Sequence, residues 1–520
     1  MLKKVKTVAL TAMKGQLIEI ETDISNGLPY FTVIGMADTS VREAAERVKR
    51  AIINSGYQYP KGKITVNLSP AYIHKRGSHY DLGIAIGLLL AQEVIEDSMT
   101  NNALFIGELS LDGSILPSKG VLPMIMSIVE NSSCEINRII LSKQNCSECY
   151  LVTKETDIKL IPVTTLKETV EYLKGSHLNE FEEESWNINN TFTLDFSDVK
   201  GHSFAKEAIM IAVAGRHNIL LIGPPGSGKT MLAKRMVTIL PPMDLAEQIE
   251  TTKIYSYAGK LHEKNPIVSK RPFRHVTSGI TIPTLVGGGT YPMPGEVSYA
   301  HNGILFIDEM LLFPEKTIES LRLPIEDKEI SITRKGEQVI FPSNFILVGA
   351  TNPCKCGYLG DEDHRCVCTQ TEINAYRSRL SGPMADRIDI AIEVSPIKYE
   401  EIQSDDRNFE TMSSADMYEK VLFAQSVQKE RYVDCPFKYN GDLWDKYIDR
   451  FCKLDKQCKL FMENIYQKEK ISPRRYNKIL KVARTVADLN GNNSIQINHL
   501  ATAFHYTRFL REKGCRNNYD

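Results

Sequence analysis

A short glycine-rich stretch carries every residue of a phosphate-binding loop. Residues 223–230 read Gly-Pro-Pro-Gly-Ser-Gly-Lys-Thr, the complete G-x-x-x-x-G-K-[ST] pattern. Its glycines let the backbone turn tightly, so that successive N–H groups point at phosphate oxygens. Lys229 is expected to reach the β and γ phosphates, and the Thr230 hydroxyl to ligate Mg²⁺. The expected nucleotide-binding residues are Gly223, Gly226, Ser227, Gly228, Lys229, Thr230 and, from a second motif, Asp308.

The second motif is an apolar run that ends in two acids. Residues 304–309 read Ile-Leu-Phe-Ile-Asp-Glu. Asp308 is expected to join Thr230 in the Mg²⁺ shell, and Glu309 to orient or activate the attacking water. Nucleotide binding needs only the first acid, whereas hydrolysis benefits from a base at the second. The two motifs together predict a nucleoside triphosphatase that uses ATP and Mg²⁺.

Three further polar residues are candidates for catalysis. Asn352 follows the apolar run 345–351 and could hydrogen-bond the attacking water or the γ-phosphate. Arg387 could be an arginine finger for a neighbouring subunit, and Arg474, at the start of a C-terminal helix, a sensor of the γ-phosphate. The alternatives stay open at this point: a turn role for Asn352, since Asn-Pro is a turn dipeptide, and surface ion pairs for both arginines.

The flanking segments predict the elements that position these residues. Residues 218–222 form a short apolar run typical of a buried strand, and residues 230–236 favour a helix. That order would place the N-terminus of the helix under the phosphates. Because strands and helices alternate from residue 195 to about 397, we expect a parallel α/β domain.

Length and composition limit the class of protein. The chain has 520 residues, too many for one core, and a formal net charge of −1, so no global field draws it to DNA or to anionic lipid. Its eleven cysteines and the lack of a secretory signal favour a reducing compartment. The most apolar segment, residues 82–91, is far shorter than the ~20 residues that span a bilayer. We therefore expect a cytoplasmic protein with no membrane partner.

Changes in pattern along the chain predict four regions. Residues 1–175 alternate strands and helices, with strands near 31–35 and 63–68 and a helix over 40–54. Residues 176–194 read as an acidic linker, and residues 195–397 as the ATPase core with a cysteine-rich loop over 354–368. From residue 398 to 520 the chain is expected to be mainly helical.

The cysteine-rich loop contains two C-x-C pairs nine residues apart. Four thiolates can close a tetrahedral zinc site, which would brace a loop too polar to build its own core. Free thiols or an iron–sulfur cluster are the alternatives. The expected ligands are Cys354, Cys356, Cys366 and Cys368.

The order of these motifs resembles that of AAA+ ATPases of the magnesium-chelatase-like group, in particular the YifB/ComM family. The resemblance covers nearly the whole chain and is strongest over 287–303, 377–383 and 481–489. It implies a homo-oligomeric ring, a hexamer in the family pattern, with ATP at subunit interfaces and a helical lid. It also implies a motor that remodels branched or single-stranded DNA by helicase or branch-migration activity. The alternative is a chelatase- or chaperone-like motor acting on a protein or metal-cofactor partner.

The N-terminal region is similar in fold to the Lon protease domain, an α+β domain. In our register the serine position of that family is occupied by His79, and the lysine position by Leu122. Ser78 and Lys119 lie nearby but out of register, and a Ser–Lys dyad needs both groups within hydrogen-bond reach. We therefore expect a non-proteolytic domain used for packing or partner binding, and an ATP-dependent protease is the last of the hypotheses.

A DNA motor should carry basic or aromatic residues on loops facing a central pore. In this chain the segments facing the substrate depart from the family pattern after Arg274 and after Glu309. A solvated basic loop with no such role is the alternative. The candidates are Lys270, Arg271, Phe273 and Arg274, and the glycine-rich segment 287–291.

Overall fold

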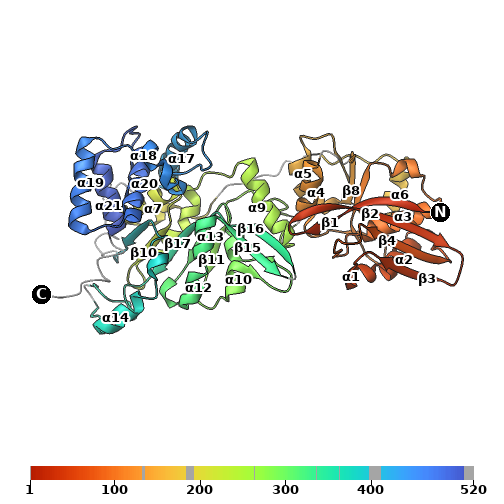
Figure 1. Ribbon diagram of the computed structural model, residues 1–520, viewed down its shortest axis with the longest axis horizontal. Helices are drawn as coiled ribbons and strands as arrows, with labels where there is room; N and C mark the ends of the chain where they lie inside the picture. Colours follow the sequence, from red (N-terminus) through yellow and green to blue (C-terminus); the bar gives the residue numbers. More distant parts are fainter. Residues whose placement is uncertain are drawn as a thin grey trace. The chain divides into compact units, whose positions relative to one another are not determined.

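The computed structural model describes residues 2–131, 135–182, 192–262, 264–334, 336–361, 364–396 and 412–508. These residues form two compact units (Figure 1). The first unit contains Met1–Ile188, Asp244–Ser269 and Thr333–Ile340, and the second contains the remainder. The units therefore divide the chain differently from the predicted domains, because two segments of the predicted ATPase core are grouped with the first unit. Part of the predicted linker lies outside the described residues. Residues 398–411 and 509–520 of the predicted lid lie wholly outside them.

A seven-stranded mixed sheet forms the centre of the first unit, in the order β3-β4-β2-β1-β5-β8-β9. The β1–β2 and β2–β4 pairs are antiparallel, whereas β3–β4, β1–β5, β5–β8 and β8–β9 are parallel. The strands predicted near 31–35 and 63–68 are β3 and β4. The bounds are β1 Lys3–Thr11, β2 Lys14–Ser25, β3 Tyr30–Ile34, β4 Lys63–Ser69, β5 Ala103–Ile106, β8 Arg138–Ser142 and β9 Lys159–Val163, with a small ladder of β6 Glu108–Leu109 and β7 Ile115–Leu116.

Both faces of this sheet are covered. Along β5, Ala103 and Phe105 join one apolar cluster while Leu104 and Ile106 join another, as the two-residue period of a strand requires. The first cluster includes residues of α2, α3 and α6, and the second residues of α4 and α5. The helices are α1 Thr39–Arg42, α2 Ala44–Asn54, α3 Asp81–Ala91, α4 Val121–Glu130, α5 Lys143–Thr153, α6 Leu166–Leu173 and, from the inserted segment, α9 Leu245–Tyr257.

Two details concern the helices of this unit. The most apolar segment of the chain is α3, in which ten of eleven residues are buried, and Gly83 and Gly87 let it lie close to β2. A Cβ on Gly87 would come within 2.6 Å of Thr22 Oγ1. The helix predicted over 40–54 is present as α1 and α2, which are interrupted only at Glu43, where the backbone stays in the helical region with φ −69° and ψ −13°.

A five-stranded parallel sheet forms the core of the second unit, in the order β11-β14-β17-β10-β18. Its central strands are apolar throughout, as expected for parallel strands covered on both faces. The predicted parallel α/β arrangement is thus confirmed. The strands are β10 Ile219–Ile222, β11 Phe273–Val276, β14 Ile304–Ile307, β17 Ile346–Thr351 and β18 Ile390–Glu393.

Short helices surround this sheet, and the chain between its strands forms two hairpins, of which the second lies largely in the first unit. The hairpins are β12 Gly287–Gly288 with β13 Met293–Pro294, and β15 Glu329–Arg334 with β16 Glu337–Pro342. The helices are α7 Ser203–Gly215, α8 Lys229–Arg235, α10 Ile282–Val286, α11 Glu296–Tyr299, α12 Glu315–Glu319, α13 Arg322–Asp327, α14 Gln370–Arg377 and α15 Gly382–Ala385.

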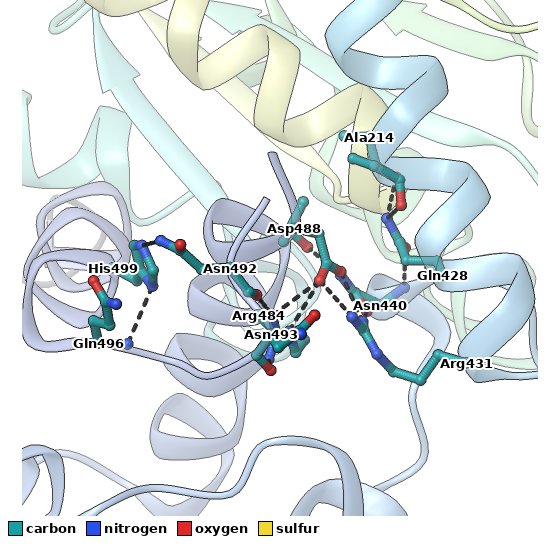
Figure 2. A network of polar contacts seen from close by, with 12 residues as sticks. Ala214, Gln428, Arg431, Asn440, Arg484, Asp488, Asn492, Asn493, Gln496 and His499 are labelled. Atoms are coloured by element: carbon teal, nitrogen blue, oxygen red, sulfur yellow. Dashed lines mark hydrogen bonds and ion pairs between the residues drawn. The ribbon is translucent and has the colours of Figure 1, made fainter. Parts of the chain in front are cut away.

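The end of the second unit is helical, as predicted, and packs on α7. Its helices share one apolar core with the sheet of the unit, and Gln428 donates a hydrogen bond to Ala214 O at the C-terminal end of α7 (3.0 Å) (Figure 2). The helices are α17 Ser414–Arg431, α18 Ile448–Phe451, α19 Lys456–Glu469, α20 Pro473–Leu489 and α21 Ile497–Arg508, drawn in blue in Figure 1.

Candidate nucleotide-binding site

The glycine-rich loop connects the central strand β10 to helix α8. Gly226 and Gly228 adopt left-handed backbone conformations, with φ of 79° and 84°, which glycine allows at little cost. Helix α8 begins at Lys229, so its free N–H groups lie at the loop, where an anion is favoured. The strand–loop–helix order predicted from the sequence is therefore present.

The Lys229 ammonium lies inside the loop. Its Nζ donates to Gly223 O and Pro224 O, both at 2.8 Å, and to Asn352 Oδ1 at 3.3 Å. Burial lowers the pKa of Lys229, and the charges of Asp308 and Glu309 oppose that shift. The contact with Asn352 places the polar end of β17 beside the glycine-rich loop.

The magnesium end of the site is formed by α8 and β14. Thr230 Oγ1 donates to Asp308 Oδ2 at 3.0 Å, so the hydroxyl and the carboxylate predicted to share one cation are adjacent. His275 Nε2 lies 3.8 Å from the same carboxylate oxygen. Hydroxyl and carboxylate oxygens are the donors that Mg²⁺ prefers, and these residues fit a cation bound beside a phosphate chain.

Glu309 lies next to this pair and is exposed. Its backbone N–H donates to Asp308 Oδ1 at 3.0 Å, and its φ is +50°. A non-glycine residue in the left-handed region carries strain of order 1–3 kcal/mol, and such strain is concentrated at functional sites. The two acids therefore leave the strand in different conformations, one beside Thr230 and one exposed to solvent.

Arg387 lies at the opposite edge of the sheet. It precedes β18, which runs parallel to β10, and its carbonyl accepts a hydrogen bond from Asn218 Nδ2 (2.8 Å) just before β10 begins. The glycine-rich loop follows the other end of β10, roughly 13 Å away for a four-residue strand. The Arg387 guanidinium is ion-paired with Glu326. Arg387 thus lies far from the loop of its own chain.

Arg474 lies at the same edge as Arg387. Its Nη1 is 3.6 Å from Asp386 Oδ2, and its side chain is 70% exposed. Both arginines predicted to act on the γ-phosphate are therefore together, but they are separated from the loop, Asp308 and Asn352 of their own chain.

The four cysteines of the loop over 354–368 converge on one point. Their sulfur atoms all lie within 4.8 Å of one another, with Sγ–Sγ distances of 3.3 Å, 3.7 Å and 3.5 Å among Cys354, Cys356 and Cys366. Zn–S bonds of ~2.3 Å in a tetrahedron require sulfur atoms about 3.8 Å apart. The donor set therefore fits zinc.

This cysteine loop also touches the nucleotide loop. A Cβ on Gly357, one residue after Cys356, would lie 2.7 Å from Cδ of Pro225, and the φ of Gly357 is +93°. Only glycine allows this approach, so Gly357 carries the contact between the two loops.

The Lon-like positions of the first unit have other contacts. His79 is buried and bonds Val8 O at 2.8 Å, and burial lowers its pKa to about 4. Leu122 is buried, and its N–H donates to Ser256 Oγ of α9 at 3.3 Å. Ser78 donates to Glu108, whereas the methylenes of Lys119 lie against Gly259.

Three of the proposed DNA-facing residues have contacts within the chain, and their role at DNA stays a prediction. Arg271 is buried and donates to Pro241 O (2.5 Å) and Asn302 O (2.7 Å). Phe273 stacks on Phe306 within the sheet. Arg274 forms two hydrogen bonds with Glu296, at 2.6 and 2.9 Å.

Lys270 and the hairpin over 287–291 keep some exposure. Lys270 Nζ lies 5.7 Å from the ring centroid of Phe192, and Tyr291, in the turn of the hairpin, is 50% exposed.

In the described ranges no helix is long and apolar enough to cross a membrane.

Two residues that hold the Arg387 segment were not predicted from the sequence. Asn218 precedes β10, and Lys478 of α20 donates to Ile388 O at 2.7 Å. Asn218 could have been found from the sequence, because it is a polar residue directly before a predicted buried strand. Lys478 had no such signal, since it is one of many lysines on a charged helix.

Three family models match this chain. They are the magnesium chelatase subunit ChlI over residues 195–402, subunit ChlI of Mg-chelatase over 20–145, and the C-terminal region of ChlI over 411–507. Competence protein ComM of Haemophilus influenzae is 39% identical over 509 residues, 97% of each chain. YifB of Escherichia coli is 36% identical over 506 residues, which is 96% of each chain. The 67 kDa subunit of the magnesium chelatase of Heliobacterium mobile is 28% identical over 32% of this chain and 29% of its own. The chain belongs to the magnesium-chelatase-like AAA+ family that includes the ComM and YifB proteins.

Proposed function

We propose that this protein hydrolyses ATP as the subunit of a homo-oligomeric ring and uses the energy to remodel branched or single-stranded DNA. The observation that carries the ATPase part is the convergence of Lys229, Thr230, Asp308 and Asn352 at the ends of three adjacent parallel strands. Phosphates would lie against the backbone N–H groups of the loop and Lys229. Mg²⁺, held by Thr230 and Asp308, would neutralise charge on the β and γ phosphates.

Glu309 is the proposed general base. It takes the proton of a water that attacks the γ-phosphate, and Asn352 orients that water. A carboxylate that is exposed and lies next to the magnesium ligand suits this role, because it reaches solvent without binding the cation. The variant that tests this role is Glu309→Gln, which keeps the size and hydrogen bonding of the side chain but removes the base, and should therefore lose ATP hydrolysis.

A second copy of the chain supplies the remaining charge in this proposal. Arg387 and Arg474 lie at the sheet edge remote from their own loop, where they would face the nucleotide of an adjacent subunit. An arginine supplied in this way accelerates phosphoryl transfer by about 10³–10⁵. The related chelatase subunits support self-association; we propose a hexamer.

The DNA part rests on the 39% identity to a protein named for competence. The alternative is a motor acting on a protein or metal-cofactor partner, which the likeness to a magnesium-chelatase subunit favours. Steady-state ATP hydrolysis with and without four-way junction DNA, at low and moderate salt, separates the two. DNA stimulation that weakens with salt and is lost in Glu309→Gln supports the first. Hydrolysis that is indifferent to DNA rejects it.

The cysteine loop is proposed to bind one structural zinc ion. Metal analysis of the purified protein should give one zinc per chain, and a Cys366→Ser variant should give much less. Equal zinc in both proteins would contradict the assignment.

A further inference from the structure

The segment that carries Arg387 is held from two sides by contacts to its backbone. On one side Asn218 donates from Nδ2 to Arg387 O (2.8 Å), while its own carbonyl accepts from Asp389 N and Ile390 N at 2.9 and 3.0 Å. Asn218 Oδ1 accepts from Leu347 N (2.9 Å) at the start of β17. The side chain of Asn218, which is 7% exposed, thus bridges two strands to the carbonyl of the arginine.

On the other side, helix α20 reaches the same segment. Lys478 Nζ donates to Ile388 O at 2.7 Å, one residue after Arg387. One turn earlier on the same face, Arg474 lies 3.6 Å from Asp386. Burial lowers the pKa of Lys478, and the charges of Asp389 and Asp386 oppose that shift. A buried ammonium without partners would be costly, so the carbonyl and these acids account for its position.

Both contacts bind main-chain carbonyls and do not involve the guanidinium of Arg387. That guanidinium pairs with Glu326, whose side chain is 37% exposed. The backbone of Arg387 is therefore anchored independently of its side chain, which is 11% exposed and would have to leave Glu326 to reach a phosphate. This arrangement suits a finger, because an arginine that acts across an interface must start from a fixed point and still move at its tip.

We propose that Asn218 and Lys478 are positioning residues that hold Arg387 for the active site of the adjacent subunit. The inference rests on the proposed ATPase ring and adds to it the residues that aim its finger. A displacement of about 1 Å at a reacting group can cost about 100-fold in rate. Loss of either contact should therefore lower kcat without changing nucleotide binding by the same chain.

The variant that tests this is Lys478→Met, which keeps the length of the side chain and removes the donor. We expect kcat to fall 10- to 100-fold. KM and the affinity for a fluorescent ATP analogue should stay within twofold of wild type, and the number of subunits in the ring should not change. Lys459→Met, an exposed lysine on α19, is the matched control and should behave as wild type. Asn218→Ser provides a second, independent variant with the same expected split.

Mixed rings distinguish positioning from general damage. Lys478→Met subunits keep Glu309 and the loop, and Glu309→Gln subunits keep the finger, so a mixture should hydrolyse ATP faster than either alone. A mixture of Lys478→Met with Arg387→Ala should show no gain, because both lack the same function. Parallel loss of nucleotide affinity or ring formation, or no gain in the first mixture, overturns the inference. A wild-type protein without ATPase activity would instead overturn the proposed function.

Discussion

The buried carboxylate of Asp488 is expected to be essential for the stability of the helical part of the second unit. It is 1% exposed and accepts hydrogen bonds from Arg431 at 2.5 and 2.8 Å, from Arg484 at 3.1 Å and from Asn440 at 2.9 Å (Figure 2). Burial by itself would lower the pKa of Arg431, but the hydrogen bonds and charge of Asp488 raise it. Arg484 is 3% exposed, so both arginines depend on this one acid.

The perturbation is Asp488→Asn, which keeps the shape and removes the charge. Two largely buried guanidinium groups would then share no counter-charge, and breaking a buried pair in this way costs about 3–5 kcal/mol. For a unit of more than 250 residues the shift is about 2 °C per kcal/mol, so the unfolding transition should fall by about 6–10 °C. The loss should also reduce ATP hydrolysis, because α20 carries Arg474 and Lys478.

Differential scanning calorimetry of the full chain measures this shift. Asp449→Asn, at an exposed position of α18, is the matched control and should change stability by no more than about 0.5 kcal/mol. Adding Arg431→Gln to Asp488→Asn should restore part of the loss, since one uncompensated charge is removed. If Asp488→Asn unfolds at the temperature of the Asp449→Asn control, the argument from buried charge is refuted.

Three further predictions concern other parts of the chain. Removing zinc with a chelator, or by Cys366→Ser, should weaken binding of a fluorescent ADP analogue several-fold, because Gly357 packs on the nucleotide loop. Unchanged affinity would show that the cysteine loop does not influence nucleotide binding. Burial raises the pKa of Glu148 from 4.5 to about 7 against hydrogen bonds from Ser256 and Asn145, so the folded state holds a proton that the unfolded state loses. Its stability should therefore fall as pH rises from about 4.5 through 7, by up to about 3 kcal/mol, and Glu148→Gln should flatten that decline in pH-dependent unfolding; an identical profile would count against it. Arg271→Gln should lower the unfolding temperature, because buried carbonyls lose their donor, yet leave the salt dependence of any DNA stimulation unchanged; a weaker salt dependence would return Arg271 to the DNA surface.

Local pattern was sufficient for the elements around the nucleotide. The loop over 223–230, the acid pair after β14 and the polar end of β17 were predicted because each motif is contiguous and follows an apolar run. Parallel strands place their carboxyl ends at one edge, so the proximity of Lys229, Asp308 and Asn352 follows from topology alone. The four cysteines were predictable for a similar reason, since two close pairs on one loop need little tertiary information to meet.

Other features were not predictable because they depend on partners distant in sequence. The chain pattern does not tell a pore-facing Arg271 from one whose donors bind the carbonyls of Pro241 and Asn302. The grouping of α9 with the first unit also lacked a local signal, since its contacts with α4 and α5 join segments about a hundred residues apart.

The sequence by itself determined that the chain has the residues of an ATPase and the order of a AAA+ protein, because those residues are set by the short-range chemistry of phosphate and magnesium. Only the tertiary structure decided where the two candidate arginines lie relative to that site. The direction of β10 and β18 separates Arg387 and Arg474 from the loop of their own chain, and the docking of α20 brings Lys478 to the segment that carries Arg387. These relations arise from packing between distant segments, and no spacing along the chain encodes them.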